Sequence, residues 1–224
     1  MKKTCLTLCI VLISYVLYAQ DEKPTQYLFG NIGKISFNGF GAPMVELSSK
    51  GGNISVSTGG GGAVLCNQKF FFGAYGMGFA TQDEVDGLKI KQSNGEIISY
   101  PSMRTVFAHG GFWLGYIHNR KNAIHWGVST KIGWGAISLV DADMNEDSHT
   151  KVGLNQVFVF TPQIEAEMNI TRWFKVNIGA GYRFVSGIDK TYTNSYGQEV
   201  AFYKTTDFNS PELCISFLFG GFGR

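Results

Sequence analysis

Five charged residues stand at alternate positions of otherwise apolar segments, on faces that they share with small or polar neighbours. These residues are Lys131, Glu165, Glu167, Lys175 and Arg183. Opposite charges that meet inside a protein form ion pairs, and removing one partner of a buried pair destabilises the fold. A turn at 169–172 would bring Glu167 opposite Lys175 and leave Glu165 diagonal to Lys175. We therefore expect an internal network of paired charges here, and not a reactive centre.

Two other segments carry groups that could do chemistry. Residues 141–147, Asp-Ala-Asp-Met-Asn-Glu-Asp, begin like a calcium loop, but Glu146 stands where that loop needs glycine and Val152 where it needs glutamate. His149 follows Ser148, but adjacent side chains rarely converge as a base and a nucleophile must. We expect a solvated acidic loop, no metal site, no cofactor and no enzyme; a weak divalent-ion contact is the alternative.

Long strands must position the charged residues, because apolar and polar side chains alternate with a period of two. Alternation is clearest over 123–139, 158–168 and 173–185. Weaker alternation covers 33–48, 53–66, 69–80, 102–118 and 208–222. The pattern therefore predicts eight strands, and it leaves the two faces of 69–80 unassigned. Pro43 and the glycine run 59–62 predict bulges or kinks.

The connections between these segments alternate in length. Short turns are expected at 67–68, 119–122 and 170–171, and long polar loops near 81–101, 140–153 and 187–207. Short periplasmic turns and long external loops are typical of outer-membrane barrels whose termini both lie in the periplasm. The first external loop, 49–52, is short and departs from this rule.

Aromatic residues on the apolar faces fit two girdles at the membrane surfaces. The predicted girdle consists of Trp126, Trp134, Phe174, Tyr182 and Phe184. With ~3.3 Å per residue and ~40° of tilt, Trp126 and Trp134 lie roughly 20 Å apart in height, and Phe174 and Phe184 about 25 Å. A soluble lipocalin-like barrel, with its apolar face inside, is the alternative.

The first 19 residues have the pattern of a secretory signal, with Lys2 and Lys3 before an apolar run and cleavage expected after Ala19. We assign 1–19 to the signal peptide, 20–32 to a periplasmic N-terminal lead and 33–224 to a barrel domain. Without the signal, 17 basic residues balance the 17 acidic ones, so no basic surface for nucleic acid is expected. Cys66 and Cys214 would lie roughly 20 Å apart, too far for a disulfide.

The signal ending in Ala19-Gln20, the hairpin 165–183 and the final strand 213–222 resemble the small OmpA/OmpX-like outer-membrane β-barrel protein family of Gram-negative bacteria. The resemblance implies an all-β, eight-stranded antiparallel up-and-down transmembrane barrel. It also implies outer-membrane lipid, lipopolysaccharide and the barrel assembly machinery as partners, and a monomer. The chain departs from the family pattern because Gly223 and Arg224 follow Phe222, where the family ends on an aromatic residue.

We expect a non-enzymatic envelope barrel with a structural or surface-interaction role and a charge-filled lumen. Tyrosines of the external loops could contact a surface partner; they are Tyr100, Tyr192, Tyr196 and Tyr203. His109 and His125 are expected to form hydrogen bonds inside the lumen. A narrow channel or a ligand-binding barrel is the alternative, and the soluble lipocalin-like binder is the least favoured form.

Overall fold

The computed structural model describes residues 35–81, 83–91, 95–141, 151–188, 191–193, 199–201 and 203–222. The chain divides into two units, Met1–Ile35 and Ser36–Arg224, and the account below concerns the second. The predicted signal peptide (1–19) and N-terminal lead (20–32) lie outside the described residues. Within the described ranges, no helix is long and apolar enough to cross a bilayer.

Strands make up almost all of the second unit. They are β1 (Phe37–Lys50), β2 (Asn53–Cys66), β3 (Phe70–Phe79), β4 (Asp83–Lys91), β5 (Ile97–Ile117), β6 (Ile124–Asp141), β7 (Lys151–Asn169), β8 (Phe174–Ser186), β9 (Thr191–Thr193), β10 (Glu199–Ala201) and β11 (Ser210–Gly220). A short 3-10 helix, η1 (Thr205–Asp207), precedes β11.

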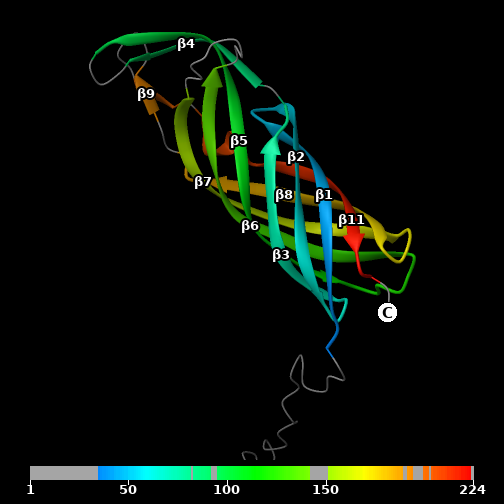
Figure 1. Ribbon diagram of the computed structural model, residues 1–224. Helices are drawn as coiled ribbons and strands as arrows, with labels where there is room; N and C mark the ends of the chain where they lie inside the picture. The colour runs from blue at the N-terminus through cyan, green and yellow to red at the C-terminus, as the bar shows by residue number, and fades with distance from the viewer. Residues whose placement is uncertain are drawn as a thin grey trace, which may run out of the picture. The chain divides into compact units, whose positions relative to one another are not determined.

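Eight of the strands close into a ring in which all pairings are antiparallel. The order is β3-β2-β1-β11-β8-β7-β6-β5, and pairing of β3 with β5 completes the ring. Figure 1 shows these strands wrapping around a common interior. The predicted eight-stranded antiparallel up-and-down barrel is therefore confirmed as the fold.

The strands at the long-loop end extend further than predicted. β4 lies within the predicted loop 81–101 and pairs with the first half of β5, from Lys91 opposite Ile97 to Asp83 opposite Thr105. This hairpin extends past the barrel (Figure 1). The segment was assigned to a loop because it is polar, but a hairpin outside the apolar wall needs no alternating apolar face.

Of the bulges or kinks predicted at Pro43 and 59–62, the ladders show no bulge at these residues. Pro43 lies opposite Gly60 in a β1–β2 ladder that runs from Phe37 to Lys50 without a register shift. Ala42 and Pro43 have no ladder partner on β11, so the missing amide hydrogen of proline falls where that ladder is interrupted. A register shift does occur in the β6–β7 ladder: Ile137 lies opposite Asn155 and Ser138 opposite Gly153, so Leu154 of β7 is the extra residue.

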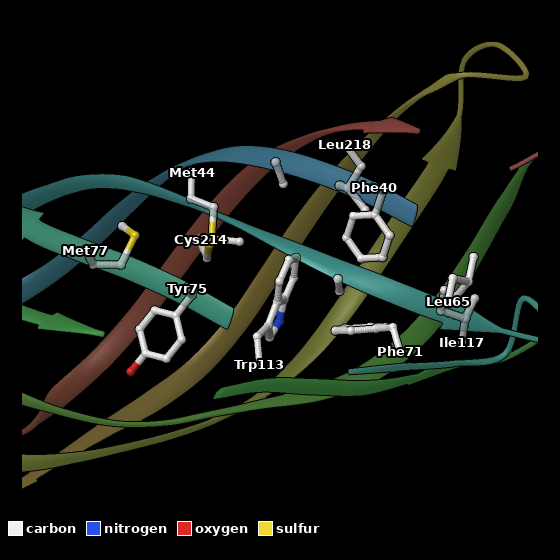
Figure 2. Close-up of a cluster of buried hydrophobic side chains, with 12 residues drawn as sticks. Phe40, Met44, Leu65, Phe71, Tyr75, Met77, Trp113, Ile117, Cys214 and Leu218 are labelled. Atoms are coloured by element: carbon white, nitrogen blue, oxygen red, sulfur yellow. The ribbon is translucent and has the colours of Figure 1, made fainter. Parts of the chain in front are cut away.

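Side chains fill the interior as two apolar clusters. The inner apolar cluster comprises Phe40, Ala42, Met44, Ala63, Leu65, Phe71, Tyr75, Met77, Trp113, Ile117, Cys214 and Leu218. Figure 2 shows these side chains converging from neighbouring strands. The outer apolar cluster, toward the long-loop end, comprises Met103, Phe107, Ile137, Leu139, Val157, Val159, Val185, Ile188 and Phe208. β3, whose faces the sequence left open, turns Phe71, Tyr75 and Met77 inward and Phe72 outward.

Glycine makes room for the large inward rings. A Cβ atom on Gly115 would lie 2.3 Å from the ring of Phe71, and one on Gly133 would lie 2.6 Å from Oη of Tyr75. Gly115 lies on β5, which pairs with β3, the strand that carries Phe71 and Tyr75. Gly133 lies on β6, one strand further from β3. The high glycine content therefore reflects the space that a narrow barrel needs for aromatic side chains.

Candidate functional site

All five charged residues predicted for the interior are buried. Lys131 is 1% exposed and Arg183 is 0% exposed, and Glu165, Glu167 and Lys175 are also buried. They come from β6, β7 and β8, whose alternate residues point to the same face. The structure does not bring the five into one network, because it places them in three groups.

The first group centres on Glu167, near the short-turn end. Its Oε1 accepts hydrogen bonds from Nζ of Lys175 at 2.5 Å and from Nε2 of His125 at 2.8 Å. Glu167 lies opposite Asn177, and Lys175 lies opposite Asn169. The Glu167–Lys175 contact is therefore diagonal and not directly across the ladder, as the sequence suggested. A shift of two residues leaves every side chain on its predicted face.

The second group surrounds Glu165. This carboxylate lies opposite Gly179, and it accepts hydrogen bonds from Oγ of Ser129 at 2.5 Å and from Nδ2 of Asn177 at 3.0 Å. Two neutral donors thus take the place of the lysine that the sequence placed diagonally to it.

The third group lies deeper and contains both remaining cations. Nζ of Lys131 donates to Oε1 of Glu46 and lies 3.9 Å from Oε1 of Glu212. Nη1 of Arg183 lies 3.7 Å from Oε2 of Glu212, and Nε2 of Gln163 donates to Oε1 of Glu212 at 3.0 Å. Two carboxylates and two cations therefore alternate in this group, which we call the charged layer: Glu46, Lys131, Arg183 and Glu212.

Sequence reasoning missed Glu46 and Glu212, although each alternates with apolar residues in the sequence. Glu46 lies between Val45 and Leu47, and both neighbours are exposed on the outer face. Glu212 alternates in the same way with Leu213 of β11. Alternation over these short apolar stretches would have placed both carboxylates inside the barrel.

Aromatic and imidazole rings surround the charged layer. The guanidinium of Arg183 lies 5.6 Å from the ring centre of Phe79 and 5.5 Å from that of Phe107, within the range of cation–π attraction. His109 is buried, and its Nδ1 lies 3.2 Å from Oη of Tyr75. His125 bonds to Glu167, so both histidines have hydrogen-bond partners in the interior.

The predicted girdle residues lie on the outside of the wall. Trp126, Trp134, Tyr182 and Phe184 are exposed, with Trp134 at 59%, and Phe174 is half-buried. The rings of Trp126 and His118 contact each other at a tilt, with centres 4.8 Å apart, close to the short turns. Trp134 contacts Phe158 at 5.9 Å, near the other end of β6. The aromatic residues thus lie at two levels of the wall.

Several predicted features cannot be placed. Residues 142–150, which hold most of the acidic segment 141–147 together with Ser148 and His149, lie outside the described residues, as does Tyr196.

Tyr203 turns toward the barrel, where its Oη lies 2.6 Å from Oγ1 of Thr105. Both Cys66 and Cys214 are free thiols. Among the side chains that the structure describes, no three His, Cys, Asp or Glu residues are grouped to hold a metal ion.

Comparison with solved structures agrees with this geometry. Neisserial surface protein A is 13% identical, with a TM-score of 0.52, and the match covers 84% of this chain and 99% of that one. The chain has the fold of the small OmpA/OmpX-like outer-membrane barrels. The N-terminal β-barrel domain of OprF from Pseudomonas aeruginosa is 8% identical with a TM-score of 0.48, and the match covers 84% of this chain and 99% of that one. No family model matches the sequence, and no curated protein matches it.

Proposed function

We propose that this protein is a non-enzymatic β-barrel of the bacterial outer membrane with a structural or surface-interaction role in the envelope. In this proposal a cleavable signal directs export, the short turns and both termini face the periplasm, and packed side chains close the lumen. The observation that carries the proposal is the polarity of the wall, which presents apolar side chains outside and keeps its buried charges inside.

Large apolar side chains cover the outer face of the strands. Among them are Phe72, Phe112, Ile124, Trp126, Trp134, Ile164, Trp173, Ile178 and Phe184. Leaving such a side chain in water forgoes roughly 1.5–3 kcal/mol of burial free energy. A soluble lipocalin-like barrel would place these residues inside, whereas a lipid environment accommodates them where they are.

The packing of side chains inside the barrel is evidence for a closed lumen. The charged layer crosses the barrel between the two apolar clusters, and the Glu167 group lies toward the short turns. An eight-stranded barrel is just wide enough for side chains to fill it. Tyr75 and His109 are both buried in this interior, away from solvent, and this supports a non-enzymatic role.

A narrow channel is the second candidate, and one observation favours it. Within the described residues, several buried polar atoms in and near the charged layer have no hydrogen-bond partner, among them Oε2 of Glu46, Oε2 of Glu212, Nη2 of Arg183 and Oγ of Ser57. Buried polar groups normally bond to protein or to ordered water, so a hydrated path along these atoms would be chemically reasonable.

Two measurements test these candidates. Electrophoresis of the outer-membrane fraction, cold and boiled, should show a band that runs faster unheated if the chain forms a closed barrel there. Recovery in the soluble periplasm with no heat shift would contradict the membrane proposal. Planar bilayers containing the refolded protein should show no current steps if side chains close the lumen, whereas regular steps would establish the narrow channel.

A further inference from the structure

The short-turn end of the barrel is strongly basic. The turns and adjacent residues, 66–70, 117–124 and 169–174, contain no Asp or Glu but include Lys69, His118, Arg120, Lys121 and Arg172. This contrast matters because the chain without its signal is formally neutral. Positive charge is thus concentrated at one end of the molecule, where it creates a local field that attracts anions.

A hollow of about 440 Å³ opens among these three turns. Its lining consists of Gln68, Arg120, Lys121, Asn169, Ile170, Thr171, Arg172, Lys175 and Phe222. Four of these residues are cationic and none is acidic. Gln68 and Lys175 are each 4% exposed, so buried polar side chains contribute to the lining as well as surface residues. We call this hollow the basic mouth.

Three of the four cations of the basic mouth have no charge partner among the described residues, and the fourth, Lys175, has one. Lys175 is bound to Glu167 and lies 4.3 Å from the ring centre of Phe222. Among the described residues, Arg120, Lys121 and Arg172 have no side-chain hydrogen bond or ion pair. Like charges held in one hollow repel one another, and an anion between them would remove that repulsion.

Hydrogen bonds tie together the two turns that carry these cations before any ligand arrives. Nδ2 of Asn169 donates to the carbonyl oxygen of Arg120 at 3.0 Å and to that of Asn122 at 2.8 Å. The amide of Asn122 donates to the carbonyl of Asn119 at 3.0 Å and closes the same turn. Asn169 thereby ties the β5–β6 turn to the β7–β8 turn. A site fixed in this way loses little entropy on binding.

We propose that the basic mouth binds a phosphate group. Two guanidinium groups can each donate a pair of parallel hydrogen bonds to phosphate oxygens, and a lysine adds a point charge. The group could belong to a free phosphate compound or to the headgroup of a phospholipid in the adjacent leaflet. The site itself rests on the fold, and only the phospholipid source rests on the proposed membrane location.

Amide chemical shifts of the full chain, refolded in a nonionic maltoside detergent, test this site. Inorganic phosphate is titrated against chloride at constant ionic strength, and dihexanoylphosphatidylglycerol is titrated in a parallel sample. We expect saturable shifts at 118–122 and 169–173. Shifts with inorganic phosphate identify a site for free phosphate compounds, and shifts with the lipid alone identify a headgroup site.

A matched pair of variants separates this site from general charge attraction. Arg120→Gln/Arg172→Gln should weaken binding by at least about tenfold for each guanidinium removed. Arg104→Gln/Lys204→Gln removes the same charge at the long-loop end of the barrel, away from the basic mouth, and should leave the affinity unchanged. The proposal is overturned if neither probe binds, if chloride gives the same shifts, or if both double variants lose affinity equally. The single variant Arg172→Gln, in an exposed turn, serves if the double variant does not fold, and a heat-shifted band confirms that each variant is a closed barrel.

Discussion

Lys131 on β6 and Glu46 on β1 form an ion pair inside the barrel, although 85 positions separate them in the sequence. In the ring order, three strands lie between β6 and β1 on one side, β11, β8 and β7, and the remaining three lie between them on the other. The two residues therefore stand on opposite walls. Both side chains are 1% exposed, so the pair braces the barrel across its interior where water does not screen it.

Removing either Glu46 or Lys131 should destabilise the barrel strongly. Glu46→Gln or Lys131→Met leaves a buried charge without its partner, and each should lower the free energy of unfolding by about 3–5 kcal/mol. The double variant should lose less than the sum of the two, because it leaves no unpaired charge. Urea unfolding in lipid vesicles, followed by tryptophan fluorescence, measures these losses. Lys69→Met, at an exposed turn, is the control and should change stability by less than about 0.5 kcal/mol; additive losses would show that the two residues do not interact.

The Glu167 group should respond differently because Glu167 has two partners. Lys175→Ala leaves the carboxylate bound to His125, whereas Glu167→Ala leaves both His125 and Lys175 without it. We expect Glu167→Ala to cost more, by about 1–3 kcal/mol. The double variant should again lose less than the sum of the single variants, in the same unfolding assay. Equal losses from the two single variants would contradict a role for His125 as the second donor.

The strand pattern of the wall was predictable because every second residue points outward and the outward positions are mostly apolar. This pattern is strong on β6, β7 and β8, and there the predicted faces of Trp126, Glu167 and Arg183 agree with the structure. β4 (Asp83–Lys91) was not predicted, because it lies in the polar segment 81–101, whose composition favours a loop.

The interior contacts were harder to predict because they join strands that are distant in sequence. Alternation shows that Lys131 points inward, but nothing local shows that its partner is Glu46 on the opposite wall. Register is similarly underdetermined: moving Lys175 by two positions relative to Glu167 preserves both faces, so only the geometry of the β7–β8 turn decides between the two ladders.

The outer face offers a direct test of the lipid environment. Ile164 is 67% exposed near the centre of the barrel portion of β7. If lipid covers this position, Ile164→Arg should cost about 2–4 kcal/mol in a bilayer. Asn53→Arg, next to the β1–β2 turn, carries the same charge at the end of the wall and should cost about 0–1 kcal/mol. Equal and small effects in vesicles would mean that water, and not lipid, surrounds Ile164.

Two glycines of similar backbone geometry should differ sharply in their tolerance of a methyl group. A Cβ atom on Gly133 would lie 2.5 Å from the carbonyl oxygen of Gly110 and 2.6 Å from Oη of Tyr75, whereas one on Gly76 would have no atom within 4 Å. The first contact is with the backbone of the neighbouring strand β5, so a rotamer change cannot relieve it. Gly133→Ala should therefore destabilise the barrel by about 1–3 kcal/mol through overpacking.

Gly76→Ala should leave stability nearly unchanged, because its methyl group points into open space on the outer face. The temperature at which the fast-running electrophoretic band disappears compares the two variants directly, with the parent chain beside them. A further variant, Gly133→Ala/Tyr75→Phe, separates the two contacts, since it removes the hydroxyl but not the backbone oxygen. If this double variant recovers most of the lost stability, the Tyr75 hydroxyl is the obstacle; if it recovers little, the spacing between β5 and β6 itself requires glycine.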